Sequence, residues 1–288
     1  FKIVVASAVL EVTNLDPEMP LPLIGGCGDV RPTGVWLIDQ STTYKNQMNL
    51  HKAFGLSCNS FFAKLAVNYI GFSSIKDYAY EFGWEKPISA DFKTFPSPLH
   101  APSVENSSIH SIGRFAAGFG RVGLSPIHAA WIMNAIANNG IATPLRLFKE
   151  ESFKQEILFN VLNIKQNELS QQILSSQTSK QLIDIMDHTV SQGTAHSTFR
   201  KYKYKFLRNM LGGKTGTLKS TNPVGIATWF VGLMPLNNPK IAVISLVILD
   251  KLWHIKATDL AAEALWKYEK IQKDLQKNLV LQGEDKTS

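Results

Sequence analysis

A glycine-flanked cationic segment with the sequence GGKTGT occupies residues 212–217, and its residue types point directly to chemistry. Glycines such as Gly216 let a backbone approach a ligand closely. The ammonium group of Lys214 supplies a positive charge, and the hydroxyls of Thr215 and Thr217 can donate hydrogen bonds to a carboxylate. The segment therefore predicts a binding site for an anionic acyl substrate.

A phosphate-binding loop is the main alternative for this segment, because residues 213–215 match the end of the G-x-x-x-x-G-K-[ST] pattern. That pattern needs a glycine five residues before Gly213 and a helix directly after it. Position 208 is Arg208, and the following residues predict a turn over 218–223 and then a strand over 226–231. The sequence therefore disfavours nucleotide binding.

The composition predicts one large domain over residues 1–288. The chain is 44% hydrophobic, enough for a large core, and no change in composition divides it. Its net charge is +7, yet the basic residues are scattered except over residues 201–208. We interpret that cluster as a solvated surface or one attracted to an anionic envelope, and we expect no nucleic-acid partner.

Cysteine and histidine usage predicts neither a disulfide framework nor a metal site. Cys27 and Cys58 are the two cysteines, so the sequence leaves open whether they form a single bridge. The seven histidines show no H-E-x-x-H pattern and no paired ligand spacing. We therefore expect no metal and no cofactor.

The longest apolar run, Ile241–Leu249, has the length of a buried strand and falls short of the roughly 18 residues of a membrane span. The chain begins at Phe1, inside an apolar helical pattern. We therefore expect that this chain was cut from a longer one and that any signal or membrane anchor lies upstream.

Hydrophobic periodicity and capping signals predict a layered α/β or α+β domain with neighbouring antiparallel strands packed under helices. Residues 145–175 are ambiguous, with a possible edge strand over 148–154, and long loops are expected over 16–33 and 87–110. The expected helices cover residues 1–12, 48–56, 61–70, 73–80, 127–139, 178–190 and 257–275, before a polar tail over about 279–288. Gly71 stops the helix over 61–70, and the helix over 73–80 is capped by Ser73 or Ser74 and ended by Gly83. The helix over 127–139 is capped by Ser125, with Pro126 at its first position and Gly140 after its end. The expected strands are a hairpin over 225–234 and 240–250, preceded by a strand that opens at Lys214.

Three pieces of sequence now combine. Lys2 lies on the first turn of a predicted helix, Ser57-x-Asn59 precedes another, and Lys214-Thr215-Gly216 opens a strand. They match the second half of S-x-x-K, then S-x-N and K-T-G, in that order. The sequence resembles the transpeptidase domain of penicillin-binding proteins over nearly the whole chain.

Three further segments carry the same resemblance. Residues 1–3 look like the S-T-F-K-I helix start of that family, residues 118–140 like its glycine turn and following helix, and residues 228–232 like its strand after K-T-G. The resemblance implies an antiparallel sheet flanked by helices, with a helical subdomain that carries S-x-N. It also implies that the nucleophilic serine and the N-terminal strands of the fold lie before Phe1.

The resemblance assigns roles to the motif residues. Lys2 would take the serine proton as general base, with its pKa lowered by burial and by the nearby Lys214. Ser57 would relay the proton to the leaving amine, and Asn59 would orient Lys2 and the substrate amide. The backbone N–H of Thr217 would help to form the oxyanion hole.

Each of these roles has a simpler structural alternative. Lys2 could be a frayed surface lysine, and Ser57 and Asn59 could be ordinary helix caps. The internal S-x-x-K, Ser73 to Lys76, follows S-x-N in the chain, and we interpret Ser73 as a cap. A second S-x-N, residues 220–222, is interpreted as part of a turn.

The function that the resemblance implies is peptidoglycan D,D-transpeptidation through a serine acyl-enzyme, a target of β-lactams. The alternatives are a β-lactamase or D,D-carboxypeptidase on the same scaffold, or a non-catalytic penicillin-sensing domain. The implied partners are stem peptides ending in D-Ala-D-Ala, β-lactam antibiotics and the cell-wall synthesis machinery. The implied location is the bacterial cell envelope, periplasmic or otherwise extracytoplasmic.

A β-lactamase needs a second base that activates water, which in class A enzymes is the glutamate of an E-x-x-x-N pattern after S-x-N. The one such pattern here, Glu156 to Asn160, lies in an apolar stretch. Three acids nearer S-x-N, Glu81, Glu85 and Glu105, lack the pattern. Class D enzymes usually carry S-x-V where this chain has an asparagine. These signals favour the transpeptidase.

The motif assignment predicts that residues 1–288 alone form no covalent adduct with a labelled penicillin, because the expected nucleophile precedes Phe1. A chain extended upstream should form the adduct. Mass spectrometry would decide, and a stoichiometric acyl adduct on Ser57 or Ser73 of the present chain would contradict the assignment.

Overall fold

An antiparallel sheet of the order β7-β8-β9 lies at the centre of the computed structural model, which describes residues 1–28, 30–38, 47–103, 107–147, 170–250 and 254–284. The three strands are β7 (Gly212–Thr221), β8 (Val224–Met234) and β9 (Ile241–Leu249). The predicted hairpin of β8 and β9 is confirmed by their continuous antiparallel pairing. The turn predicted over 218–223 is wrong in its first part, because residues 218–221 pair with β8 and extend β7.

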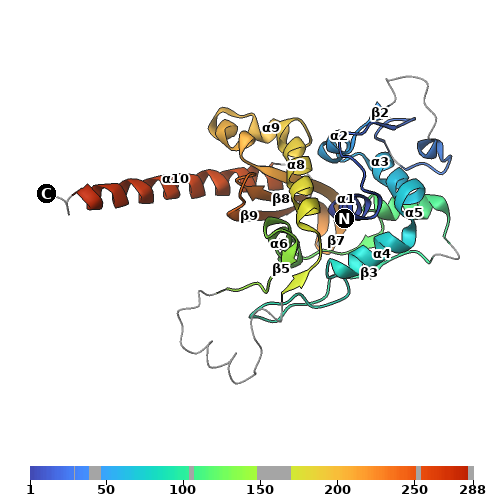
Figure 1. Ribbon diagram of the computed structural model, residues 1–288, viewed down its shortest axis with the longest axis horizontal. Helices are drawn as coiled ribbons and strands as arrows, with labels where there is room; N and C mark the ends of the chain where they lie inside the picture. Colours follow the sequence, from blue (N-terminus) through green and yellow to red (C-terminus); the bar gives the residue numbers. More distant parts are fainter. Residues whose placement is uncertain (29, 39–46, 104–106, 148–169, 251–253, 285–288) are drawn as a thin grey trace.

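Strand β8 is buried on both faces, which explains its nearly continuous apolar sequence. Val231 and Leu233 pack into a core formed with helices between α1 and α8, whereas Phe230 and Met234 pack into a second core under the C-terminal helix. Because successive strand residues point to opposite faces, the alternation assigns one set to each layer. The sheet is therefore the middle layer of the molecule (Figure 1).

Helix α1 (Lys2–Thr13) forms the centre of the first core. Residues 4–10 are buried without interruption, so the helix is surrounded by protein on all sides. It contacts α8 (Ser176–Ser191) and α4 (Phe72–Glu81), and its N-terminal end lies in the middle of the molecule near β7 (Figure 1). The helix predicted over residues 1–12 is confirmed.

A helical region carries the S-x-N segment, as expected. It consists of α2 (Leu50–Gly55), α3 (Asn59–Lys64) with its π-helical continuation η3 (Leu65–Ile70), α4 and α5 (Ile109–Ala116). Gly71 ends η3 at φ 83°, as predicted. The capping role predicted for Ser73 or Ser74 is wrong, because α4 begins directly after Gly71 without a side-chain cap.

Helix α6 (Pro126–Ala137) follows its predicted capping signals closely. The hydroxyl of Ser125 accepts a hydrogen bond from the backbone N–H of His128 at 3.1 Å, and Pro126 occupies the first turn. Gly140 has φ 88°, and a Cβ there would lie 2.0 Å from the carbonyl oxygen of Leu174. Only glycine fits this position.

Several elements differ from the expectation. Helix α5 lies partly in the predicted loop over 87–110, with Ser108 as its cap. Helix α10 (Ala257–Glu284) continues beyond the expected end near Leu275 and projects from the body (Figure 1). The possible edge strand over 148–154 lies outside the described residues. The remaining elements are β1 (Leu21–Pro22) paired with β2 (Gln47–Met48), β3 (Leu99–His100) with β4 (Arg121–Val122), β5 (Ile141–Ala142) with β6 (Gln171–Gln172), and the short helices η1 (Val35–Leu37), α9 (His196–Phe199) and η5 (Tyr202–Asn209).

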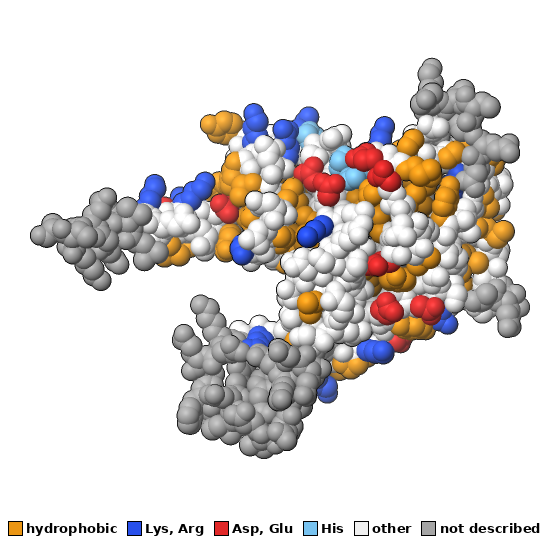
Figure 2. Space-filling model, viewed as in Figure 1, with side chains coloured by type: hydrophobic (Ala, Val, Ile, Leu, Met, Phe, Trp, Pro, Cys, Tyr) orange, Lys and Arg blue, Asp and Glu red, His pale blue; other side chains and the backbone are white. Residues whose placement is uncertain are grey.

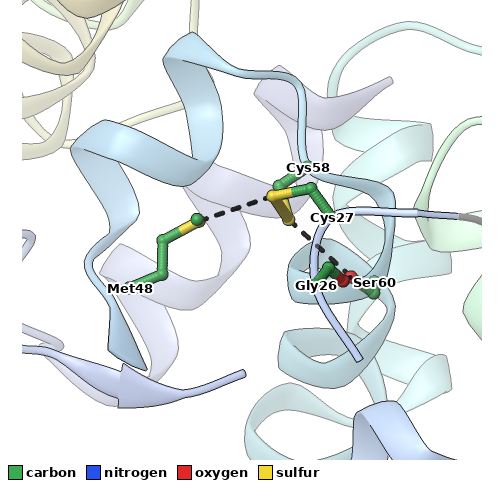
Figure 3. The surroundings of a disulfide bond; sticks show 5 residues. All are labelled: Gly26, Cys27, Met48, Cys58 and Ser60. Carbon is green, nitrogen blue, oxygen red and sulfur yellow. Dashed lines mark hydrogen bonds between the residues drawn. A yellow bond between two sulfur atoms is a disulfide. The ribbon is translucent and has the colours of Figure 1, made fainter. Parts of the chain in front are cut away.

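A disulfide joins Cys27 and Cys58, which answers the question that the sequence left open (Figure 3). It fastens the turn around Gly26 to the start of α3, where the hydroxyl of Ser60 donates to the carbonyl of Gly26 at 2.5 Å. The ammonium of buried Lys64 donates to two further carbonyls of the same loop region. These ties hold the glycine-rich loop against the helical region.

The disulfide predicts a measurable loss of stability when it is removed. Its cysteines are separated by 31 positions, and the loop-closure model assigns about 3 to 4 kcal/mol to a ring of that size. Cys27→Ser should therefore lower the free energy of unfolding in urea by roughly that amount. Cys58→Ser and the reduced parent should show the same loss of stability as Cys27→Ser. Reductant should not change the stability of a variant that carries both Cys27→Ser and Cys58→Ser. Equal stability of parent and Cys27→Ser would contradict a formed bond.

Candidate active site

One cavity of about 390 Å³ brings together all the site residues that the sequence predicted. The seven come from separate segments of the chain, and they meet where α1, the α2–α3 junction and β7 converge. They are Lys2, Ser57, Asn59, Lys214, Thr215, Gly216 and Thr217. The described residues that line the cavity include three lysines, Lys256 being the third, and no carboxylate.

Lys2 is the first residue of α1 and reaches into this cavity. Its ammonium donates to the carbonyl oxygen of Ala117 at 2.7 Å and lies 5.9 Å from the centre of the Phe62 ring. Burial lowers the pKa of Lys2 to about 8. The alternative of a frayed surface lysine is therefore wrong, because the side chain is enclosed and held.

Lys214 lies on β7 and is 8% exposed. Its ammonium donates to the carbonyl oxygen of Thr215 at 3.1 Å and lies 5.5 Å from the centre of the Phe54 ring. Burial, and then the positive charge of Lys2, hold the pKa of Lys214 well below its ordinary value. A bound anion would oppose both effects, because it favours the charged form of the lysine.

The expectation that Lys214 helps to lower the pKa of Lys2 needs a correction. Burial lowers the pKa of Lys2. Repulsion between the two lysines lowers the pKa of Lys214, as a smaller cause beside burial. Lys214 is the more deeply enclosed of the two lysines.

Ser57 and Asn59 stand at the junction of α2 and α3. Ser57 has φ 56°, a left-handed conformation that serine rarely adopts. The N-cap of α3 is Cys58, and no side chain caps that helix. The helix-cap alternative is therefore wrong for this α3 terminus, and both polar side chains line the cavity instead.

The residue between them, Cys58, is fully buried and forms the disulfide to Cys27 (Figure 3). Its backbone N–H donates to the carbonyl oxygen of Ala53 at 2.8 Å. Cys58 thus fixes the backbone of the Ser57-x-Asn59 motif from its buried side. The direction of the Ser57 and Asn59 side chains is then set by the turn in which they lie.

Strand β7 forms one wall of the cavity. A Cβ at Gly213 would lie 2.5 Å from the carbonyl oxygen of Val231 and 2.6 Å from the Phe230 ring, so the position requires glycine. In the described sheet β7 is an edge strand. Alternate N–H groups of an edge strand point away from its neighbour and are available to other partners. Thr217 lies on this wall.

Five polar residues of the cavity lining were not predicted as site residues from the sequence: Thr194, Ser197, Thr228, Lys256 and Thr258. The hydroxyl of Thr194 lies 2.5 Å from that of Thr215, and its backbone N–H donates to the carbonyl oxygen of Gly55 at 3.0 Å. In the sequence, residues 192–194 follow the helix predicted over 178–190 and indicate only its end. The signal available in the sequence was the small and hydroxyl residues next to Thr194. These residues do not show that their side chains enter this cavity.

The rival motifs lie elsewhere. Ser73 is exposed on α4, and it does not line the cavity. Ser220 belongs to β7 and not to a turn, which corrects that interpretation. Among the acids, Glu85 accepts a hydrogen bond from the backbone N–H of Leu99, and neither it nor Glu81 lines the cavity. Glu105 and the Glu156 to Asn160 pattern lie outside the described residues. In the described part of the chain, no group of three or more His, Cys, Asp or Glu side chains is placed to hold a metal ion.

Comparison with known proteins gives consistent matches. A model of the penicillin-binding protein transpeptidase domain matches residues 1–266. The peptidoglycan D,D-transpeptidase PbpA of Mycolicibacterium smegmatis is 28% identical over 203 residues, which cover 69% of this chain and 38% of that protein.

Two solved structures share the fold at lower identity. The D,D-transpeptidase domain of a peptidoglycan glycosyltransferase from Eggerthella lenta has a TM-score of 0.65 at 22% identity, covering 94% of this chain and 64% of that one. Penicillin-binding protein A from M. tuberculosis, in an imipenem acyl-enzyme complex, has a TM-score of 0.65 at 20% identity, covering 93% and 58%. The chain thus spans less than two thirds of the length of these relatives.

The lowered pKa of Lys2 predicts how acylation by a penicillin depends on pH in a chain extended upstream. Only the neutral amine can accept a proton, so the rate should rise with pH and level off above about 8. Lys2→Ala should lose the rise and slow acylation by about 100 to 10,000-fold. Stopped-flow rates between pH 6 and 10 would measure this.

Lys214→Ala serves as the comparison variant. It should weaken substrate recognition but keep the rise of the rate with pH, because Lys2 remains. A profile without any rise, or equal rates for Lys2→Ala and the parent, would remove Lys2 from the proton transfer.

Proposed function

The chain belongs to the penicillin-binding protein transpeptidase family, and from that premise we propose that it is the catalytic part of a peptidoglycan D,D-transpeptidase. The observation that carries the proposal is the convergence of Lys2, Ser57-x-Asn59 and Lys214-Thr215-Gly216 on one cavity. The substrate would be a stem peptide ending in D-Ala-D-Ala, and a β-lactam would occupy the same place.

The terminal carboxylate of the substrate would bind against β7. Lys214 supplies the charge there, and the hydroxyls of Thr215 and Thr194 are 2.5 Å apart and face the same cavity. Because the described lining contains no acid, a carboxylate would meet no like charge from it. Entry of the anion would also relieve the repulsion between Lys214 and Lys2, so binding and protonation of Lys214 support each other.

The acylation step would use the serine expected two residues before Phe1. Its oxygen attacks the carbonyl of the penultimate D-alanine while its proton moves to the neutral amine of Lys2. A serine and a lysine three residues apart share one face of a helix, which places the two groups together. The C–N bond then breaks, and the proton passes through Ser57 to the leaving amine of D-alanine.

Charge on the tetrahedral intermediate would be stabilised by backbone N–H groups. The N–H of Thr217 on edge strand β7 is the proposed donor from this chain. One such donor is worth about 3 to 4 kcal/mol of transition-state stabilisation. The amide of Asn59 would orient the substrate. Asn59 was also expected to orient Lys2, but among the described contacts the ammonium of Lys2 donates to the carbonyl oxygen of Ala117.

The acyl-enzyme is then consumed by an amine of a neighbouring stem peptide, which forms the cross-link and restores the serine. Hydrolysis would instead require a group that activates water. The described residues lining the cavity offer no carboxylate for that task. This observation favours transfer over β-lactamase or carboxypeptidase activity.

The proposed location is the extracytoplasmic side of the bacterial cell envelope, together with other cell-wall synthesis proteins. The Cys27–Cys58 disulfide supports it, because such bonds persist in oxidising compartments. Within the described residues, no helix has both the length and the apolar character needed to cross a bilayer.

A chain extended upstream tests the proposal. With an acyl-D-Ala-D-Ala peptide and an amine acceptor it should release D-alanine and form the cross-linked product, detected by mass spectrometry. Its penicilloyl adduct should persist far longer than one turnover. Ser73→Ala, which changes an exposed serine outside the cavity, should leave both results intact. Repeated nitrocefin hydrolysis at about 1 to 1,000 per second would overturn the transpeptidase assignment.

A further inference from the structure

Two segments that line the cavity continue directly into the same surface. Thr194 and Ser197 line the cavity, and the chain then runs through α9 to η5. Lys256 and Thr258 also line it, and α10 starts between them. The surface formed by residues 200–208 and by α10 therefore begins at the rim of the cavity.

This surface carries a net positive charge. Residues 200–208 contain five Lys or Arg and no acid, and residues 257–277 of α10 contain four Lys and four Asp or Glu. Figure 2 shows Lys and Arg side chains gathered along the edge where α9, η5 and α10 lie. We call this surface the basic ridge, and its members are Arg200, Lys201, Lys203, Lys205, Arg208, Lys267, Lys270, Lys273 and Lys277.

Two of the four acids in residues 257–277 form ion pairs that hold the ridge together. The ammonium of Lys201 lies 2.8 Å from the carboxylate of Asp259, and that of Lys203 lies 2.5 Å from Glu263. The hydroxyl of Tyr204 donates to Glu263 at 2.8 Å as well. These contacts fix η5 on α10.

The remaining cations of the ridge are accessible to a ligand. Arg200, Lys205, Lys270 and Lys273 are exposed, and none of them forms an ion pair within the described part of the chain. The ridge has nine Lys or Arg and its segments contain four Asp or Glu, so it presents a net positive charge along an ordered edge that starts at the cavity.

Aromatic rings lie among these cations. Tyr202 is 97% exposed at the start of η5. Phe206 lies under the ammonium of Lys273, at 5.2 Å from the ring centre, and Trp266 under that of Lys203, at 4.2 Å. A ring of this kind has a flat apolar face and, in tyrosine, a polar edge. It can cover one face of a sugar ring while neighbouring lysines bind carboxylates.

We propose that the basic ridge binds a peptidoglycan strand, as an acidic glycan whose peptides carry carboxylates, while one peptide of that strand occupies the cavity. The inference rests on the proposed function, because the cavity must take a stem peptide for the strand to continue over the ridge. The ridge would hold the polymer through several weak contacts, so that the local concentration of peptide ends at the cavity rises. Exposed charge contacts of this kind are screened by salt.

Co-sedimentation of the 288-residue chain with purified insoluble peptidoglycan tests the proposal. The ridge variant is Arg200→Gln with Lys205→Gln and Lys270→Gln. The matched control removes the same charge on other faces, through Lys86→Gln with Lys93→Gln and Lys180→Gln. The ridge variant should bind about tenfold more weakly and the control within about twofold of the parent, as expected for three exposed charge contacts. Parent binding should fall steeply as salt is raised.

Two further measurements separate the outcomes. Penicillin acylation of an upstream-extended chain should be equal for parent, ridge variant and control, because a small β-lactam needs only the cavity. Failure of acylation in the parent would count against the proposed function. Normal acylation with equal sedimentation of ridge variant and control would overturn the ridge proposal alone. Binding to phosphatidylglycerol vesicles without binding to peptidoglycan would also overturn it, in favour of a lipid surface.

Discussion

The two-sided burial of β8 is the constraint on which the arrangement depends. Val231 and Leu233 fix one layer of helices, and Phe230 and Met234 fix the other. Strand β7 pairs with β8 along its whole length, so the register places Thr217 opposite Thr228 and Lys214 opposite Val231. The wall of the cavity is therefore positioned by the same strand that joins the two cores.

The electrostatics of the cavity follow from this packing. Two lysines from separate elements are enclosed near each other without a described carboxylate in the lining, an arrangement that costs stability by itself. A folded protein can hold such groups because the surrounding helices and sheet provide the compensating burial of apolar surface. The cost falls when an anion enters, because a negative charge favours the protonated form of both lysines, and the proposed binding of a carboxylate would have this effect.

Much of this structure could be predicted from the sequence, and the exceptions have physical reasons. Helix α6 and the β8–β9 hairpin carry strong local signals, and three ordered motifs sufficed to name seven residues that share one cavity. The position of Thr194 depends on a close approach between α2 and the end of α8, which no local pattern records. The continuation of β7 to Thr221 depends on its ladder with β8, which overrides the turn preference of Ser220 and its neighbours.

The contact between Gly55 and Gly193 restricts how this wall of the cavity can vary. A Cβ at Gly193 would lie 2.2 Å from the carbonyl oxygen of Gly55, and one at Gly55 would lie 2.8 Å from the carbonyl oxygen of His188. Thr194 is therefore held in the cavity by two backbones that touch, and neither position offers a side chain to vary. Any change in the shape of this wall has to come from the exchangeable side chains around it, because the backbone contact itself admits no substitution without displacing Thr194.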